Sequence, residues 1–178
     1  MRILIEGAQG TGKTSLIEAL KKACPELEMV EALRPKDFDT GNLELDQVDL
    51  INAYLKQTRE KSDGVWDRGF LSGFAITKLL ISEKGLHSSV LSYYENQVFD
   101  KEFYNLYDWI FILEPLDLNS VPDDNRRDTR VDVRDEIQYN IMNYMKKIDK
   151  KFKGLYDIFP GNLSVESRVG LIKGLLKL

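Results

Sequence analysis

Near its start the chain carries Gly7-Ala8-Gln9-Gly10-Thr11-Gly12-Lys13-Thr14, directly after the apolar run Ile3-Leu4-Ile5. The spacing is G-x-x-x-x-G-K-T, in which the backbone N–H groups of a glycine-rich loop converge on phosphate oxygens. A Cβ atom at Gly7 or Gly12 would obstruct the turn or the approach of an anion. The segment therefore predicts a P-loop between a strand and a helix, and binding of a nucleoside triphosphate. The alternative is a glycine-rich turn that only connects the two elements.

Each side chain of this loop has an expected task. Lys13 can reach the β- and γ-phosphates as a point charge, and Thr14 can offer its hydroxyl to Mg²⁺. The helix that starts near Gly12 adds its positive dipole end. The predicted cofactors are therefore ATP and Mg²⁺. The residues expected to bind ATP here are Gly7, Gln9, Gly10, Thr11, Gly12, Lys13, Thr14 and Ser15.

Length and composition favour one soluble globular domain over residues 1–178. The chain has 178 residues, of which 43% are hydrophobic and 30% charged, and this is ordinary for such a domain. No stretch reaches the ~18 apolar residues of a membrane span. Met1-Arg2 leads straight into the first apolar run, without the pattern of a signal peptide. We therefore expect a cytoplasmic protein with no membrane partner.

Cysteine and histidine counts narrow the possible chemistry. Cys24 and His87 are each the only residue of their type, so the sequence cannot supply a His/Cys metal cluster. The formal net charge is −4, which argues against a nucleic-acid partner that covers a large surface. The expected partner is a small molecule.

Strand and helix patterns alternate along the chain, as in α/β proteins with a mainly parallel sheet. We expect a three-layer P-loop NTPase fold with about five strands between helices. The polar segment 117–134 is expected to form an Arg-rich lid. The predicted strands are 2–6, 27–30, 65–67, 109–113 and 155–159, and the predicted helices are 13–23, 43–60, 70–82, 88–104, 132–150 and one from about 165.

In such a sheet, ligands bind at the carboxyl ends of the strands. We therefore expect four places to converge: Gly7, Glu31, Asp67 and the segment after Leu113.

A second informative segment is Trp66-Asp67-Arg68-Gly69-Phe70-Leu71-Ser72. Together with Ile5-Glu6-Gly7, this Asp-Arg-x-x-x-Ser arrangement resembles the thymidylate kinase and deoxynucleoside kinase superfamily. Glu31-Ala32-Leu33-Arg34 resembles the Glu-x-x-Arg of nicotinamide-riboside-kinase-like P-loop proteins. The resemblance implies that Asp67 acts near Mg²⁺ and that Arg68 contacts the transferred or acceptor phosphate. The alternative is an adjacent ion pair that caps a helix.

The carboxylate of Glu31 bears on whether the acceptor is a nucleoside or a nucleoside monophosphate. A carboxylate can accept the proton of a nucleoside 5′-hydroxyl, whereas Arg34 and Arg68 could grip the phosphate of a nucleoside monophosphate. The sequence permits either acceptor, and Glu31 could also be a surface carboxylate. Gln57 and Phe70 are further candidates for contact with the acceptor. Phe70 follows the Asp-Arg pair, and the resemblance places the helix of Gln57 beside the acceptor pocket.

Four arginines lie in or next to the expected lid: Arg126, Arg127, Arg130 and Arg134. Arg126 and Arg130 are candidates to stabilise charge on the transferred phosphoryl group, and Arg127 is a candidate to bind ATP. The alternative is a solvated, salt-bridged helix. Asn162 follows the last predicted strand, where we expect contact with the base of ATP.

The favoured function is phosphoryl transfer from ATP to a nucleoside monophosphate, preferably a deoxynucleotide. The alternative acceptor is a nucleoside 5′-hydroxyl. Two further hypotheses are a regulatory P-loop ATPase without a small-molecule acceptor and a polynucleotide 5′-kinase. A homodimer through the predicted helix that begins at Phe70 is also possible.

Overall fold

The computed structural model describes residues 1–33, 35–99, 105–116, 130–149 and 154–178. Within them, five strands form one sheet in the order β2-β3-β1-β4-β5, and every neighbouring pair is parallel. This order places β1 in the centre, so the loop that follows β1 lies at the middle of the carboxyl edge. The strands are β1 (Arg2–Glu6), β2 (Met29–Val30), β3 (Gly64–Asp67), β4 (Trp109–Leu113) and β5 (Leu155–Phe159).

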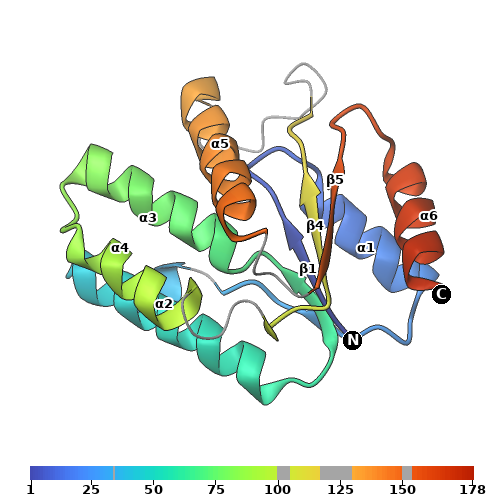
Figure 1. Cartoon of the computed structure of the whole chain (residues 1–178), viewed down its shortest axis with the longest axis horizontal. Helices are drawn as coiled ribbons and strands as arrows, with labels where there is room; N and C mark the ends of the chain where they lie inside the picture. The colour runs from blue at the N-terminus through green and yellow to red at the C-terminus, as the bar shows by residue number, and fades with distance from the viewer. Residues whose placement is uncertain (34, 100–104, 117–129, 150–153) are drawn as a thin grey trace.

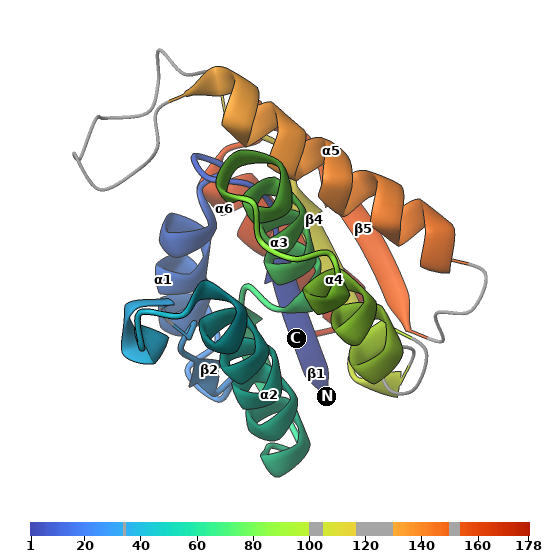
Figure 2. The same cartoon turned by 90° about the vertical axis from the view of Figure 1, so that its left-hand side faces the viewer.

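Helices cover both faces of the sheet (Figure 1). On one face lie α1 (Lys13–Ala23) and α6 (Val165–Leu176), which pack against each other. The other face carries α2 (Leu43–Glu60), α3 (Phe70–Lys84), α4 (Ser89–Tyr94) and α5 (Val131–Ile148). Figure 2 shows this second layer from outside, with α5 lying across α3.

The side chains of β1 alternate between the two faces of the sheet, so that this strand contributes to the core under each helical layer. Ile3 and Ile5 belong to the core under α1 and α6, while Leu4 belongs to the core under α2 to α5. All three are at most 1% exposed. A strand buried on both faces reads as a continuous apolar run, as parallel sheets require.

The predicted three-layer α/β fold is confirmed, with small differences at element ends. The strand expected at 27–30 is limited to Met29–Val30, because only these residues pair with β3. The helix expected at 88–104 consists of α4 followed by a π-helical segment, Glu95–Phe99. A short 3₁₀ helix, Pro35–Phe38, was not predicted from the pattern.

The predicted lid and the search for membrane-spanning helices are both limited by which residues the structure describes. Most of the predicted lid, residues 117–129, lies outside them, and α5 begins at Val131. None of the described helices combines the length and the apolar composition needed to cross a bilayer.

Candidate active site

The loop after β1 has the backbone conformation that its glycines predict. Gly7, Gly10 and Gly12 have φ angles of 142°, 71° and 81°, which favour glycine. A Cβ atom on Gly7 would lie 2.6 Å from the carbonyl oxygen of Leu113, so β4 closes one side of the loop. Gly12 is the N-cap of α1, and the amide groups of the first turn of α1 therefore open toward the loop.

Lys13 is held inside this loop. Its ammonium donates to the carbonyl oxygens of Gly7 and Ala8, both at 2.5 Å, and to Oγ1 of Thr11 at 3.0 Å. The residue is only 5% exposed. Thr14 and Ser15, the next residues of α1, are exposed. The structure thus places a cation in the loop and two exposed hydroxyl-bearing residues at its helical end.

Side chains from distant elements also hold the loop. Oε1 of Gln138, on α5, accepts a hydrogen bond of 2.9 Å from the amide of Ala8. Arg168, on α6, donates through Nη1 to the carbonyl oxygen of Thr11 at 2.6 Å. Both side chains are buried. Neither contact was predicted from the sequence, because polar residues on amphipathic helices are normally expected on the exposed face.

Glu6 is a third residue beside the loop that was not predicted from the sequence to be a site residue. It is fully buried at the end of β1 and accepts hydrogen bonds from the amides of Leu71 at 3.1 Å and Ser72 at 3.3 Å, and from the Ser72 hydroxyl. Burial raises the pKa of Glu6, while the Ser72 hydrogen bonds and the charges of Lys13 and Arg68 oppose this shift. The available sequence signal was a carboxylate at the end of an otherwise apolar strand.

Asp67 and Arg68 lie at the end of β3, beside the loop. Asp67 pairs with Ile5 in the strand register, and the amide of Arg68 donates to the Ile5 carbonyl oxygen at 3.0 Å. Oδ1 of Asp67 is buried and has no hydrogen-bond partner among the described residues. Burial raises the pKa of Asp67, and the nearby Lys13 and Arg68 lower it.

The backbone of Arg68 has a φ angle of 67°. Non-glycine residues with positive φ are uncommon and occur preferentially at functional sites. This conformation turns the chain between β3 and the start of α3.

The residues expected to contact the acceptor differ in their exposure to solvent. Glu31 is exposed immediately after β2, and Nε2 of Gln57 donates to its carbonyl oxygen at 3.1 Å. The structure thus brings Glu31 and Gln57 together. Phe70, in contrast, is 0% exposed, and its ring packs edge-on against Tyr54 and Tyr94. The helix α3 thus turns the ring of Phe70 into the core, which does not favour its expected contact with the acceptor.

The predicted arginines are described only in part. Arg34, Arg126 and Arg127 lie outside the described residues. Arg130 forms an ion pair of 3.1 Å with Glu83 at the end of α3. Arg134 donates through Nη1 to the carbonyl oxygen of Leu116 at 3.4 Å. A catalytic role for Arg126 and Arg130 remains a prediction.

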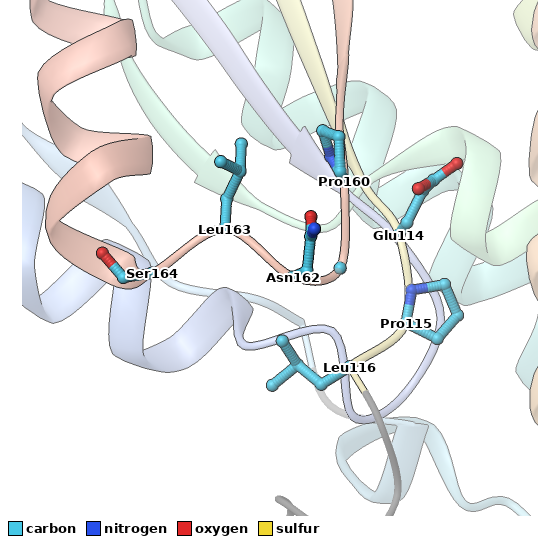
Figure 3. Close-up of a pocket in the computed structure, with 8 residues that line it drawn as sticks. Glu114, Pro115, Leu116, Pro160, Asn162, Leu163 and Ser164 are labelled. Atoms are coloured by element: carbon cyan, nitrogen blue, oxygen red, sulfur yellow. The ribbon is translucent and has the colours of Figure 1, made fainter.

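A cleft of about 540 Å³ lies beside the loop, at the ends of β4 and β5 (Figure 3). The amide of Leu116 donates to the carbonyl oxygen of Gly10 at 3.2 Å, which joins the cleft to the loop. Asn162 is exposed on the cleft wall, at the place expected to contact a base. The lining residues are Glu114, Pro115, Leu116, Pro160, Gly161, Asn162, Leu163 and Ser164.

The residues at the loop suit a Mg²⁺ ion that is bound partly by phosphates and water, rather than a metal ion bound by protein side chains alone. In the described ranges, no group of three His, Cys, Asp or Glu side chains could hold a metal ion. Mg²⁺ in phosphoryl-transfer sites is held by one or two protein oxygens together with phosphates and water. The exposed hydroxyl of Thr14 and the unpartnered Oδ1 of Asp67 are oxygen donors of this kind.

Comparison with solved structures identifies the fold. A deoxyadenosine kinase from M. mycoides with bound dCTP has a TM-score of 0.71 at 14% identity, over 99% of both chains. The chain has the fold of the P-loop nucleoside and nucleotide kinases. A thymidylate kinase from Candida albicans shares this kinase fold with a TM-score of 0.65 at 13% identity, over 98% of this chain and 90% of that one.

A third structure with the kinase fold is the YorR protein from Bacillus subtilis in complex with phosphorylated GDP. Its TM-score is 0.61 at 15% identity, over 100% of this chain and 96% of that one. No family model and no curated protein matches the sequence. At the level of the fold, the resemblance predicted from the P-loop and the Asp-Arg segment is confirmed.

Proposed function

We propose that the protein is an ATP-dependent kinase that transfers the γ-phosphoryl group to a nucleoside monophosphate, preferably a deoxynucleotide. The observation that carries the proposal is the order of groups along the carboxyl edge of the sheet. The cleft follows β4 and β5, the P-loop follows the central β1, and Asp67 and Glu31 follow β3 and β2. A donor on one side and an acceptor on the other would meet at the P-loop.

The donor side suits ATP. The base would occupy the cleft near Asn162, and the phosphates would lie against the loop amides and the ammonium of Lys13. The similar structures support a nucleotide ligand, since the deoxyadenosine kinase was solved with dCTP and also with dATP.

Thr14 and Asp67 would hold Mg²⁺ together with the phosphates. When bound, Mg²⁺ supplies charge neutralisation for the β- and γ-phosphoryl oxygens. Asp67 suits this task because its oxygen is buried, unpartnered among the described residues and adjacent to the loop. Lys13 would bind the same phosphates from the loop side.

The acceptor side offers a cation and a carboxylate. Arg68, together with Arg34, would bind the acceptor phosphate, because guanidinium groups match phosphate geometry in a bidentate way. Glu31 and Gln57 would then contact the nucleoside part. In this assignment Arg34 and Arg68 bind the acceptor, while Lys13 and the Mg²⁺ held by Thr14 and Asp67 would stabilise the charge on the transferred phosphoryl group.

A nucleoside acceptor is the second candidate, and one observation favours it. Glu31 is exposed at the strand end, and its carboxylate is therefore accessible to accept the proton of a 5′-hydroxyl.

Phosphoryl transfer from Mg-ATP should be measured across nucleosides, nucleoside monophosphates and 5′-hydroxyl oligonucleotides, with Lys13→Ala as the control. We expect turnover of one deoxynucleoside monophosphate, with loss of activity in the control. Transfer to no acceptor, with slow ATP hydrolysis retained, would contradict the kinase proposal and favour a regulatory ATPase. Transfer only to the oligonucleotide would favour a polynucleotide kinase.

Two variants distinguish the small-molecule acceptors. For a monophosphate acceptor, Arg34→Ala should mainly raise the acceptor KM, and Glu31→Gln should leave kcat largely unchanged. For a nucleoside acceptor, Glu31→Gln should lower kcat by about 100-fold or more, the contribution typical of a general base, and Arg34→Ala should have little effect. Equal behaviour of the two variants would support neither version.

A further inference from the structure

Arg168 on α6 is a buried arginine that contacts two parts of the donor side. It is 1% exposed. Its Nη1 donates to the carbonyl oxygen of Thr11 in the P-loop at 2.6 Å. Its Nη2 donates to the carbonyl oxygens of Pro160 at 3.0 Å and Gly161 at 3.4 Å, both in the wall of the cleft. One side chain therefore joins the loop after β1 to the loop after β5.

The chemistry of this contact is unusual for a residue that only fills the core. Burying a guanidinium group is costly, and buried arginines are normally paired with a carboxylate. Here all the acceptors are backbone carbonyls, and Nε is buried without a partner among the described residues. The positive charge of Arg168 thus remains uncompensated by these contacts. An anion bound at the adjacent P-loop would benefit from it.

The geometry of the contact also constrains the two loops. The guanidinium group is planar and rigid, so the separation of Nη1 and Nη2 sets the spacing between the two loops. The loop after β5 also packs closely against the segment after β4, because a Cβ atom on Gly161 would lie 2.0 Å from the carbonyl oxygen of Pro115.

We propose that Arg168 is a positioning residue that couples recognition of the donor base to the placement of the P-loop. The inference rests on the proposed function, in that the cleft and the loop hold the base and the phosphates of one ATP. Because the guanidinium group of Arg168 is bonded to both loops, a base bound in the cleft would also fix the position of the P-loop. The positive charge of Arg168 would strengthen phosphate binding. Arg168 touches neither the base nor the reacting atoms in this assignment.

The coupling is tested by comparing ATP with inorganic tripolyphosphate, which lacks the base. Binding of each is measured by calorimetry for the wild type, Arg168→Met, Arg168→Lys and the control Lys173→Met, which removes a positive charge from the same helix. Arg168→Met should weaken ATP binding by about tenfold more than it weakens tripolyphosphate binding. Arg168→Lys should retain the charge and restore tripolyphosphate binding, while the extra affinity for ATP stays reduced.

The possible results separate the two proposals. Equal losses for ATP and tripolyphosphate, or no loss for either, would overturn the coupling. A wild-type protein that binds neither ligand would overturn the proposed function itself. If Arg168→Met does not fold, Arg168→Lys carries the test, and an unchanged ratio of ATP to tripolyphosphate affinity in it would also overturn the coupling. Lys173→Met should match the wild type.

Discussion

At the scale of single residues, this site concentrates polar groups in places where they are costly. Glu6 and Arg168 are buried, Oδ1 of Asp67 has no partner among the described residues, and Arg68 has a positive φ angle. Such features lower stability unless the surrounding structure compensates for them. Their clustering around the P-loop indicates that the site is arranged for a charged ligand.

Asp67→Asn tests the metal-binding assignment. The amide keeps the size of the side chain and loses the charge that would hold Mg²⁺. We expect kcat to fall by about 100-fold or more, the loss typical of removing one electrostatic stabiliser, and the Mg²⁺ concentration for half-maximal activity to rise. The measurement is the initial rate as a function of Mg²⁺, with Asp63→Asn, an exposed neighbour, as the control. An unchanged dependence of the rate on Mg²⁺ would show that Asp67 does not hold the metal ion.

At the scale of elements, the start of α3 is attached to the end of β1. The Glu6 carboxylate accepts from two amides of the first turn of α3, which have no partners within the helix. A negative charge at a helix N-terminus is also favoured by the helix dipole. Because β1 leads into the P-loop and α3 follows Asp67 and Arg68, this one contact holds two parts of the site together.

Glu6→Gln should change the pH dependence of stability. The folded pKa of Glu6 is raised above its ordinary value of 4.5, so the folded state holds the proton more tightly than the unfolded state. The wild type should therefore lose stability as the pH rises from about 4.5 to the raised pKa, and the variant should lack this loss. Chemical denaturation across this range measures the difference.

The control for this prediction is Glu18→Gln, a substitution at an exposed site on α1. It should leave the wild-type pH profile unchanged. Gln at position 6 can still accept the two amide hydrogen bonds, so kinase activity near neutral pH should largely persist. A Glu6→Gln profile parallel to that of the wild type would show that Glu6 does not titrate differently in the folded state.

At the scale of the whole molecule, the sheet order separates the proposed donor side from the proposed acceptor side. The cleft lies after β4 and β5, next to α6, whereas Glu31 and Asp67 follow strands on the other side of β1. The P-loop is therefore the place where the two sides meet. A ligand that contacts both sides would add contacts between elements that follow strands on opposite sides of β1.

ATP with Mg²⁺ should consequently stabilise the whole fold. At a ligand concentration about 100 times Kd, the expected gain is about 2.7 kcal/mol. For a domain of this size that corresponds to a rise in Tm of roughly 5 to 10 °C. Thermal unfolding by calorimetry is the measurement, and Lys13→Ala should show a much smaller rise. No shift in the wild type at millimolar Mg-ATP would contradict the donor assignment.

Much of the fold follows from local patterns. The boundaries of α1 and α2 agree with the predicted ranges, because their apolar periodicity and their flanking residues are local properties. The loop glycines were likewise predictable, since their spacing reflects backbone conformation. The burial of Phe70 was not predictable, because an aromatic residue after a functional motif carries no sign of which way its helix will turn it.

Local sequence patterns predict the alternation of strands and helices, the phosphate loop, and the set of residues at the strand ends, because each depends on neighbours a few positions away. The burial of Glu6, Gln138 and Arg168 beside the loop depends instead on how distant elements pack together. Gln138 and Arg168 contact residues 130 and 157 positions away in the chain. Whether a polar side chain faces solvent or a distant backbone depends on how the layers pack, and local periodicity holds no information about that partner.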